Sequence, residues 1–217
     1  TLVDRENKNV LLDSGTSINY DQLVVATGSL HSYFGNDEWS NYSKGLKGIN
    51  DALVIRENLL KAFEKAENET DQEIKQEFLN FVVIGGGPTG VEMAGSIAEI
   101  AYKTLNKEFN NFNSEDPNVY LIEANDKLLP MFSKKLSDKA EQYLNDFGVK
   151  VLKNEKVTNV NNSNVETDKR TIKSRNIIWA AGNTASSLIE KLNTITDDNG
   201  RAIVNPDCSL KDDPDVF

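Results

Sequence analysis

Residues 81–95 read Phe-Val-Val-Ile-Gly-Gly-Gly-Pro-Thr-Gly-Val-Glu-Met-Ala-Gly, and this stretch decides the fold. A short β-branched run leads into the pattern Gly85-x-Gly87-x-x-Gly90, and a helical pattern follows directly. This strand, turn and helix context turns a weak glycine pattern into a prediction of a dinucleotide-binding unit. In such units the first glycine permits a tight turn, the second lets the backbone approach a pyrophosphate, and the third brings helix and strand close together.

The same loop predicts an anion site that needs no basic side chain. The first N–H groups of a helix have no partner within the helix, and the helix dipole favours negative charge there. We therefore expect the N–H groups of Thr89, Gly90 and Val91 to hold the pyrophosphate. Pro88 lacks an N–H group, which costs nothing at a helix start. A P-loop is excluded, because Val91 and Glu92 stand where it needs Lys followed by Ser or Thr.

An acidic residue completes the motif at the end of the next predicted strand. Residues 118–124 read Asn-Val-Tyr-Leu-Ile-Glu-Ala, and Glu123 stands where such motifs bind the adenosine ribose. It lies further from the glycines than the usual ~20 residues, and the polar residues 103–117 account for the surplus as a helix extension and a loop. The alternative is a surface glutamate after an ordinary buried strand. A carboxylate at the ribose would repel a 2′-phosphate, so we expect NAD rather than NADP.

Composition limits the classes of function. The 24 basic and 34 acidic residues among 217 give a net charge of −10, which argues against general binding of nucleic acid or anionic lipid. Cys208 is the only cysteine, so Cys-x-x-Cys chemistry of the thioredoxin or glutathione reductase type is disfavoured. His31 is the only histidine, too few for a two-histidine metal site, and we expect it in a loop or at the surface rather than in a Ser-His-Asp triad. No apolar run approaches the ~18 residues of a membrane span and no signal peptide is apparent, so we expect a cytoplasmic location.

Hydrophobic patterns predict strands and helices in alternation through the middle of the chain. Strands are expected at 81–84, 118–124, 149–152 and 176–180, helices at 50–67, after the glycine loop and at 134–147, and a small antiparallel meander at 156–161, 163–167 and 171–173. This order predicts an α/β fold with a Rossmann-like parallel sheet.

Two of the predicted helices are amphipathic. The helix at 50–67 has its apolar residues at Leu53, Leu59, Leu60 and Phe63. The helix at 134–147 has them at Leu136, Ala140, Tyr143, Leu144 and Phe147, and Gly148 is expected to end it.

The two ends of the sequence carry strands without partner helices. Residues 10–15 and 17–20 predict a hairpin, 23–26 a buried strand, and 202–204 and 215–217 further strands. Such segments are an unusual start and finish for a domain, so we expect a fragment of a longer protein.

These segments together resemble a known superfamily. Residues 20–28 (Tyr-Asp-Gln-Leu-Val-Val-Ala-Thr-Gly), the glycine loop, Glu123 and residues 179–182 (Trp-Ala-Ala-Gly) resemble pyridine-nucleotide-dependent flavoprotein oxidoreductases with two dinucleotide-binding domains. The resemblance covers nearly the whole chain.

Within that superfamily, three segments are similar to type II NADH dehydrogenases, the single-subunit NADH:quinone oxidoreductases. They are residues 85–92 (Gly-Gly-Gly-Pro-Thr-Gly-Val-Glu), residues 123–132 with Leu-Leu-Pro-Met-Phe at their end, and residues 29–35 ending in Tyr-Phe-Gly. The resemblance implies transfer of a hydride from NADH to FAD and then of electrons to quinone.

The resemblance also implies a division into domains. It gives residues 29–182 as the NADH-binding domain with a connecting helix, between two parts of an FAD-binding domain at 1–28 and 183–217. The family's other FAD motifs and its quinone-site and membrane-anchoring segments have no counterpart in this sequence. FAD is therefore expected in the full-length parent and not in this fragment, which alone should be inactive.

Individual residues take their roles from the same resemblance. Thr27 and Gly28, and Ala181 and Gly182, mark the two crossings between the domains, where small residues let the backbone approach the cofactors. Glu92 corresponds to a glutamate close to nicotinamide and flavin, and is the catalytic candidate. Its alternative role is to complement the helix dipole, worth about 0.3–1 kcal/mol.

Two other functions remain open at this point. One is a soluble flavoprotein reductase that passes electrons to an iron-sulfur protein or to oxygen. The other is a non-enzymatic NADH-sensing module. For the parent, the resemblance implies a peripheral position on the cytoplasmic membrane face and is compatible with a homodimer.

Overall fold

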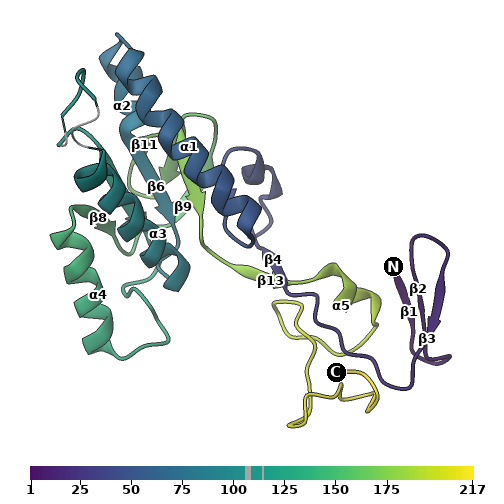
Figure 1. Ribbon diagram of the computed structural model, residues 1–217. Helices are drawn as coiled ribbons and strands as arrows, with labels where there is room; N and C mark the ends of the chain where they lie inside the picture. The colour runs from purple at the N-terminus through teal and green to yellow at the C-terminus, as the bar shows by residue number, and fades with distance from the viewer. Residues whose placement is uncertain (106–108, 114) are drawn as a thin grey trace. The chain divides into compact units, whose positions relative to one another are not determined.

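The computed structural model describes residues 1–105, 109–113 and 115–217 (Figure 1). Internal contacts divide the chain into two units. The central unit comprises residues 33–182, and the flanking unit comprises residues 1–32 together with 183–217. Each unit is described by itself.

A five-stranded parallel sheet forms the centre of the central unit. Its strands are β5 (Lys44–Gly45), β6 (Asn80–Ile84), β7 (Asn118–Ile122), β8 (Val149–Leu152) and β12 (Asn176–Trp179), in the spatial order β5-β12-β6-β7-β8. Every neighbouring pair is parallel. The predicted α/β fold with a Rossmann-like sheet is confirmed, and the strand that carries the glycine loop lies in the middle of it.

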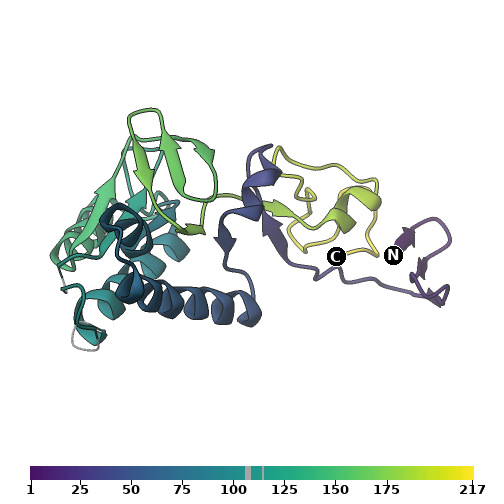
Figure 2. The ribbon, with the colours of Figure 1, turned by 90° about the horizontal axis from the view of Figure 1, so that it is seen from above.

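Helices cover one face of this sheet and a β-meander covers the other. The helices are α1 (Ile49–Asn68), α2 (Gln72–Leu79), α3 (Pro88–Glu99) and α4 (Lys134–Asp146), and the meander consists of β9 (Val157–Val160), β10 (Asn164–Thr167) and β11 (Thr171–Lys173). Alternate residues of β6 face the two layers: Phe81 and Val83 pack with the helices, and Val82 and Ile84 pack with the meander. In Figure 2 the green meander and the dark blue α1 lie on opposite sides of the central unit.

The residues between α3 and β7 are described in part. A π-helical turn (Ile100–Thr104) continues α3, and the N–H groups of Asn110 and Asn111 donate to the Glu67 carboxylate at 3.0 and 2.9 Å. The predicted helix extension and loop at 103–117 fall partly on residues 106–108 and 114, which lie outside the described residues.

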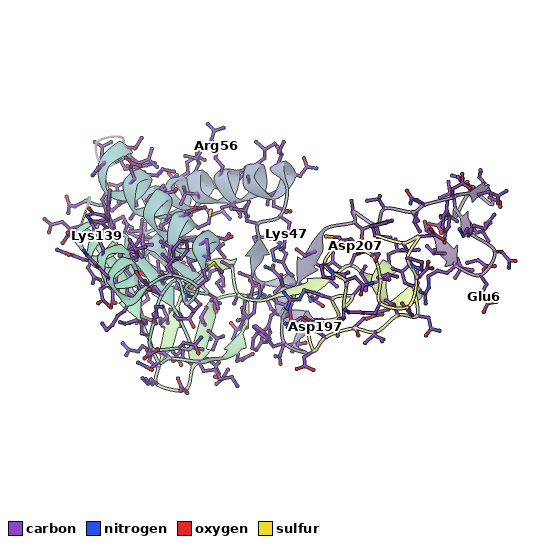
Figure 3. The ribbon with its side chains drawn as sticks, turned by 90° about the horizontal axis from the view of Figure 1, so that it is seen from below. Glu6, Lys47, Arg56, Lys139, Asp197 and Asp207 are labelled. Carbon is purple, nitrogen blue, oxygen red and sulfur yellow. The ribbon has the colours of Figure 1, made fainter. Side chains whose placement is uncertain are left out.

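The predicted apolar face of α1 is only partly correct. Leu59 and Phe63 are buried, whereas Leu53 and Leu60 are 55% and 38% exposed. The buried stripe of α1 consists of Ile55, Leu59, Ala62, Phe63 and Ala66. The buried face thus includes the small Ala62 and Ala66 beside large apolar residues, while Leu53 and Leu60 lie outside it. Arg56, on the solvent side of α1, points away from the central unit (Figure 3).

The face of α4 departs further from the prediction. Leu144 is buried as expected, but Leu136, Tyr143 and Phe147 are exposed, and the second buried residue is Ser137. The Ser137 hydroxyl donates to the Leu128 carbonyl at 2.5 Å, which satisfies its buried polar group. The predicted helix end is correct, since Gly148 follows α4 with φ +86°.

The flanking unit contains two small sheets and a short helix. Three antiparallel strands, β1 (Leu2–Asp4), β2 (Asn9–Leu11) and β3 (Ser17–Asn19), include the predicted hairpin. The second sheet pairs β4 (Ser29–His31) with β13 (Asn183–Ala185), and α5 (Ser187–Lys191) follows.

The buried strand predicted at 23–26 is wrong. The Leu23 N–H donates to the Asp215 carbonyl at 2.8 Å, and the Phe217 N–H donates to Leu23 at 2.8 Å, so this segment forms a short parallel ladder with residues 215–217. Val24 is nevertheless 72% exposed. Two short segments alone cannot bury both faces of such a ladder. The expected strand at 202–204 likewise forms only isolated bridges.

Candidate dinucleotide-binding site

The structure gives the first and third glycines of the motif a packing role. Gly85 has φ +111°, and a Cβ placed there would lie 2.7 Å from the Ala180 carbonyl carbon and from the Ala181 nitrogen. A Cβ on Gly90 would lie 1.8 Å from the Gly85 carbonyl oxygen. These two positions therefore exclude any side chain, because β6, α3 and the end of β12 meet there.

Gly87 differs from both neighbours in having open space beside it. A Cβ built on Gly87 would meet no atom within 4 Å. Gly87 is the N-cap of α3, and Pro88 is the first helical residue. A ligand can therefore reach the backbone at the positive end of the helix dipole.

The expected set of N–H donors at this helix start needs one correction. The Val91 N–H donates to the Gly87 carbonyl at 3.0 Å, which closes the first helical turn. Val91 is thus not a donor for a ligand. The N–H groups of Thr89 and Gly90 come before the first hydrogen bond of the helix, so neither has a carbonyl acceptor within the helix.

Glu123 is buried at the carboxyl end of β7, with 9% of its surface exposed. Its Oε2 accepts from the Gly86 N–H at 2.7 Å, while Oε1 accepts from the backbone N–H and the side-chain Nδ2 of Asn125 at 2.8 and 2.6 Å. The alternative of an ordinary surface glutamate is therefore wrong. A carboxylate offers about four acceptor sites, so three donors from the chain leave room for a ribose hydroxyl.

The nearest cation of this segment is already engaged. Lys127 Nζ donates to the carbonyl oxygens of Pro130, at 3.2 Å, and of Phe132. Its ammonium group stabilises its own loop, so it is not offered to a phosphate on the ribose.

Glu92 lies on the exposed surface of α3, beyond the first turn, which contains no acidic residue. Interaction with the helix dipole falls off within the first turn. The dipole explanation of this glutamate is therefore weak.

The residues at the two crossings belong to different units. Ala181 and Gly182 end the central unit, and the Ala181 nitrogen lies against Gly85. Thr27 and Gly28 belong to the flanking unit, where Gly28 has φ +69°.

Sequence reasoning missed Gly86 and Asn125. A Cβ on Gly86 would lie 2.6 Å from Leu128 Cδ2 and 2.9 Å from Glu123 Oε2, so a side chain here would displace both of these groups. The uninterrupted run of three glycines was the available signal. For Asn125 the signal was weaker: an amide two residues after a carboxylate at a strand end.

A comparison with protein-family models matches residues 1–217 to the pyridine nucleotide-disulphide oxidoreductase family. The chain belongs to this family. Two curated relatives from Mycobacterium tuberculosis are each 40% identical: the type II NADH:quinone oxidoreductase NdhA, over 95% of this chain and 46% of its own length, and Ndh, over 91% and 45%. The chain thus spans about half the length of the curated relatives that it matches.

Solved structures agree with this assignment. NDH2 from Plasmodium falciparum in complex with NADH superimposes with a TM-score of 0.78 and 27% identity, covering 87% of this chain and 41% of that protein. A water-forming NADH oxidase from Lactobacillus brevis, at a TM-score of 0.69 and 23% identity, shares the fold.

The described residues contain neither a metal-binding cluster nor a membrane-spanning helix. Among them, no three His, Cys, Asp or Glu side chains are grouped so that they could hold a metal ion. No helix in the described part of the chain has the length and apolar character needed to cross a membrane.

Proposed function

We propose that this chain is the NADH-binding part of an FAD-dependent NADH:quinone oxidoreductase. The observation that carries the proposal is the open backbone at Gly87, where α3 begins, beside a buried carboxylate from Glu123. The mycobacterial relatives named for this activity support it. Because the chain spans about half of their length, the activity belongs to a longer parent protein.

The residues present fit one dinucleotide. We assign Gly87 and the N–H groups of Thr89 and Gly90 to the pyrophosphate, where the helix dipole offsets its charge. Gly85 and Pro88 hold the loop in shape. Val91 contributes through the first helical hydrogen bond and not as a donor to the ligand.

We assign Glu123 to the adenosine ribose, whose hydroxyl would donate a hydrogen bond to the remaining acceptor site of the carboxylate. The Ala181 nitrogen lies against Gly85, and we assign Ala181 and Gly182 to the nicotinamide side. Thr27 and Gly28 are assigned to FAD in the parent, with the flanking unit as part of its FAD-binding domain and the central unit as its NADH-binding domain. When bound, nicotinamide supplies a hydride and flavin accepts it.

The test is an anaerobic titration of the full-length parent with NADH, followed by flavin absorbance. We expect loss of the flavin band at one equivalent of NADH. An unchanged band with NADH bound would contradict the proposal and favour an NADH-sensing module. Turnover with a short-chain quinone, compared with ferredoxin and oxygen, then identifies the acceptor.

Glu92→Gln in the full-length parent is expected to slow flavin reduction or the following quinone step about tenfold, the equivalent of about 1.4 kcal/mol. The exchange removes charge and keeps size, and Glu92 is exposed, so the fold should be unaffected. Stopped-flow traces of NADH oxidation and a melting curve decide together. Rates equal to the unmodified enzyme would remove Glu92 from catalysis, and early melting would make it a structural residue.

The purified 217-residue chain is expected to hold no tightly bound FAD and to show no NADH:quinone turnover, because the sequence has one complete glycine loop. Visible absorbance after denaturation measures the flavin. Stoichiometric flavin in this chain would overturn the expectation.

For the parent we propose a peripheral position on the cytoplasmic membrane face, because quinones dissolve in membranes, and a homodimer. Cell fractionation with salt washes tests the first. Light scattering on the purified parent tests the second.

A further inference from the structure

Both backbone polar groups of Gly86 are hydrogen-bonded to one loop. Its N–H donates to Glu123 Oε2 at 2.7 Å, and its carbonyl accepts from the Leu129 N–H at 2.8 Å. Residues 123–129 therefore hold the middle of the glycine loop in place through two hydrogen bonds, one of them to a charged group.

The residues around these two hydrogen bonds are buried and tightly packed. Gly86, Glu123 and Leu128 are all buried. Leu129 has φ +49°, a region that side chains other than glycine seldom adopt. A strained residue persists where its surroundings hold it in place, and here its N–H is directed to Gly86.

We propose that Glu123 is a positioning residue for the pyrophosphate cradle, in addition to any bond with ribose; this rests on the proposed nucleotide site. By fixing the Gly86 peptide, the carboxylate keeps Gly87 and the start of α3 in the arrangement that receives a diphosphate. All three donors on Glu123 come from the chain itself, so this role precedes ligand binding.

The energetic consequence reaches beyond ribose. If the glycine loop samples several conformations, its apparent affinity for a ligand is proportional to the fraction of molecules in the conformation that can bind. Losing a hydrogen bond to a charged group costs enough to lower that fraction about tenfold or more. Every diphosphate ligand should then bind more weakly, with or without ribose hydroxyls.

The experiment uses Glu123→Asp in the full-length parent with two probes, ADP and 2′,3′-dideoxy-ADP. Aspartate keeps the charge but draws the carboxylate back by one methylene, out of reach of Gly86. We expect the affinities for both probes to fall about tenfold or more by calorimetry. Asn125→Ala is the matched control, since it removes a donor to Oε1 and leaves the Gly86 bond; both probes should bind it within about threefold of the unmodified protein.

A weaker affinity for ADP with an unchanged affinity for 2′,3′-dideoxy-ADP would overturn the proposal and leave Glu123 as a ribose acceptor only. Binding of neither probe to the unmodified protein would instead contradict the nucleotide site itself. Hydrogen exchange of the Gly86 amide needs no variant. In the unmodified protein we expect slow exchange of this amide without nucleotide. Fast exchange would overturn the proposal even if the Glu123→Asp variant failed to fold.

Discussion

Gly90→Ala is expected to destabilise the protein by about 3 kcal/mol or more, whereas Gly87→Ala is expected to leave its stability unchanged. The added methyl carbon at Gly90 would lie 1.8 Å from the Gly85 carbonyl oxygen, and backbone cannot move aside as a flexible side chain does. At Gly87 the same carbon meets no atom within 4 Å, and the residue's φ of −75° is ordinary for alanine. Urea denaturation of both variants measures the difference.

The Gly87→Ala variant should also show a defect in nucleotide binding. Gly87→Ala places a methyl group where we assign the pyrophosphate, so its affinity for NADH should fall about tenfold or more while the fold persists. Calorimetric titration checks this. An unchanged NADH affinity in a stable Gly87→Ala variant would contradict the pyrophosphate assignment, and a stable Gly90→Ala variant would contradict the packing described for α3.

The pattern of the central sheet could be predicted from sequence because its signals are local. Parallel strands buried on both faces read as continuous apolar runs, as β6 and β12 do. Their helices and meander follow at spacings that leave few other topologies. The glycine pattern adds the position of the site, since it must stand between a strand and a helix.

The faces of the helices could not be predicted in the same way. In α1 the buried stripe uses Ala62 and Ala66, and in α4 it uses Ser137, whereas the larger Leu53 and Leu136 remain exposed. Close packing against a sheet favours small residues at the contact, and a hydrophobicity pattern ranks large residues first. The distance between layers decides this, and sequence periodicity does not contain it.

The hydrogen bonds of the site were also beyond sequence reasoning. The Val91 N–H serves the helix and not the ligand, and the Glu123 carboxylate serves Gly86 before any ribose. Both pairings depend on the path of the backbone through the turn at residues 85–91. Residue type and spacing fix which groups are near, while the backbone path fixes which of them pair.

NADH is expected to bind this site about a hundredfold more tightly than NADPH, a difference of about 2.7 kcal/mol. A 2′-phosphate would lose the ribose hydroxyl bond to Glu123 and face its charge, and like charges brought together in a site cost several kcal/mol. Lys127 cannot offset this without giving up the carbonyls of Pro130 and Phe132. Calorimetric titration of the full-length parent with each nucleotide measures the ratio.

The control is Glu123→Gln, which removes the charge and keeps the size of the side chain. Both nucleotides should bind this variant more weakly, because the hold on Gly86 is weakened, but the preference for NADH should fall toward parity because the repulsion is gone. Lys127→Gln should leave the preference unchanged, since its ammonium group is bonded to the carbonyls of Pro130 and Phe132. Equal affinities of the unmodified protein for NADH and NADPH would remove Glu123 from the ribose site and leave it only its bonds to Gly86 and Asn125.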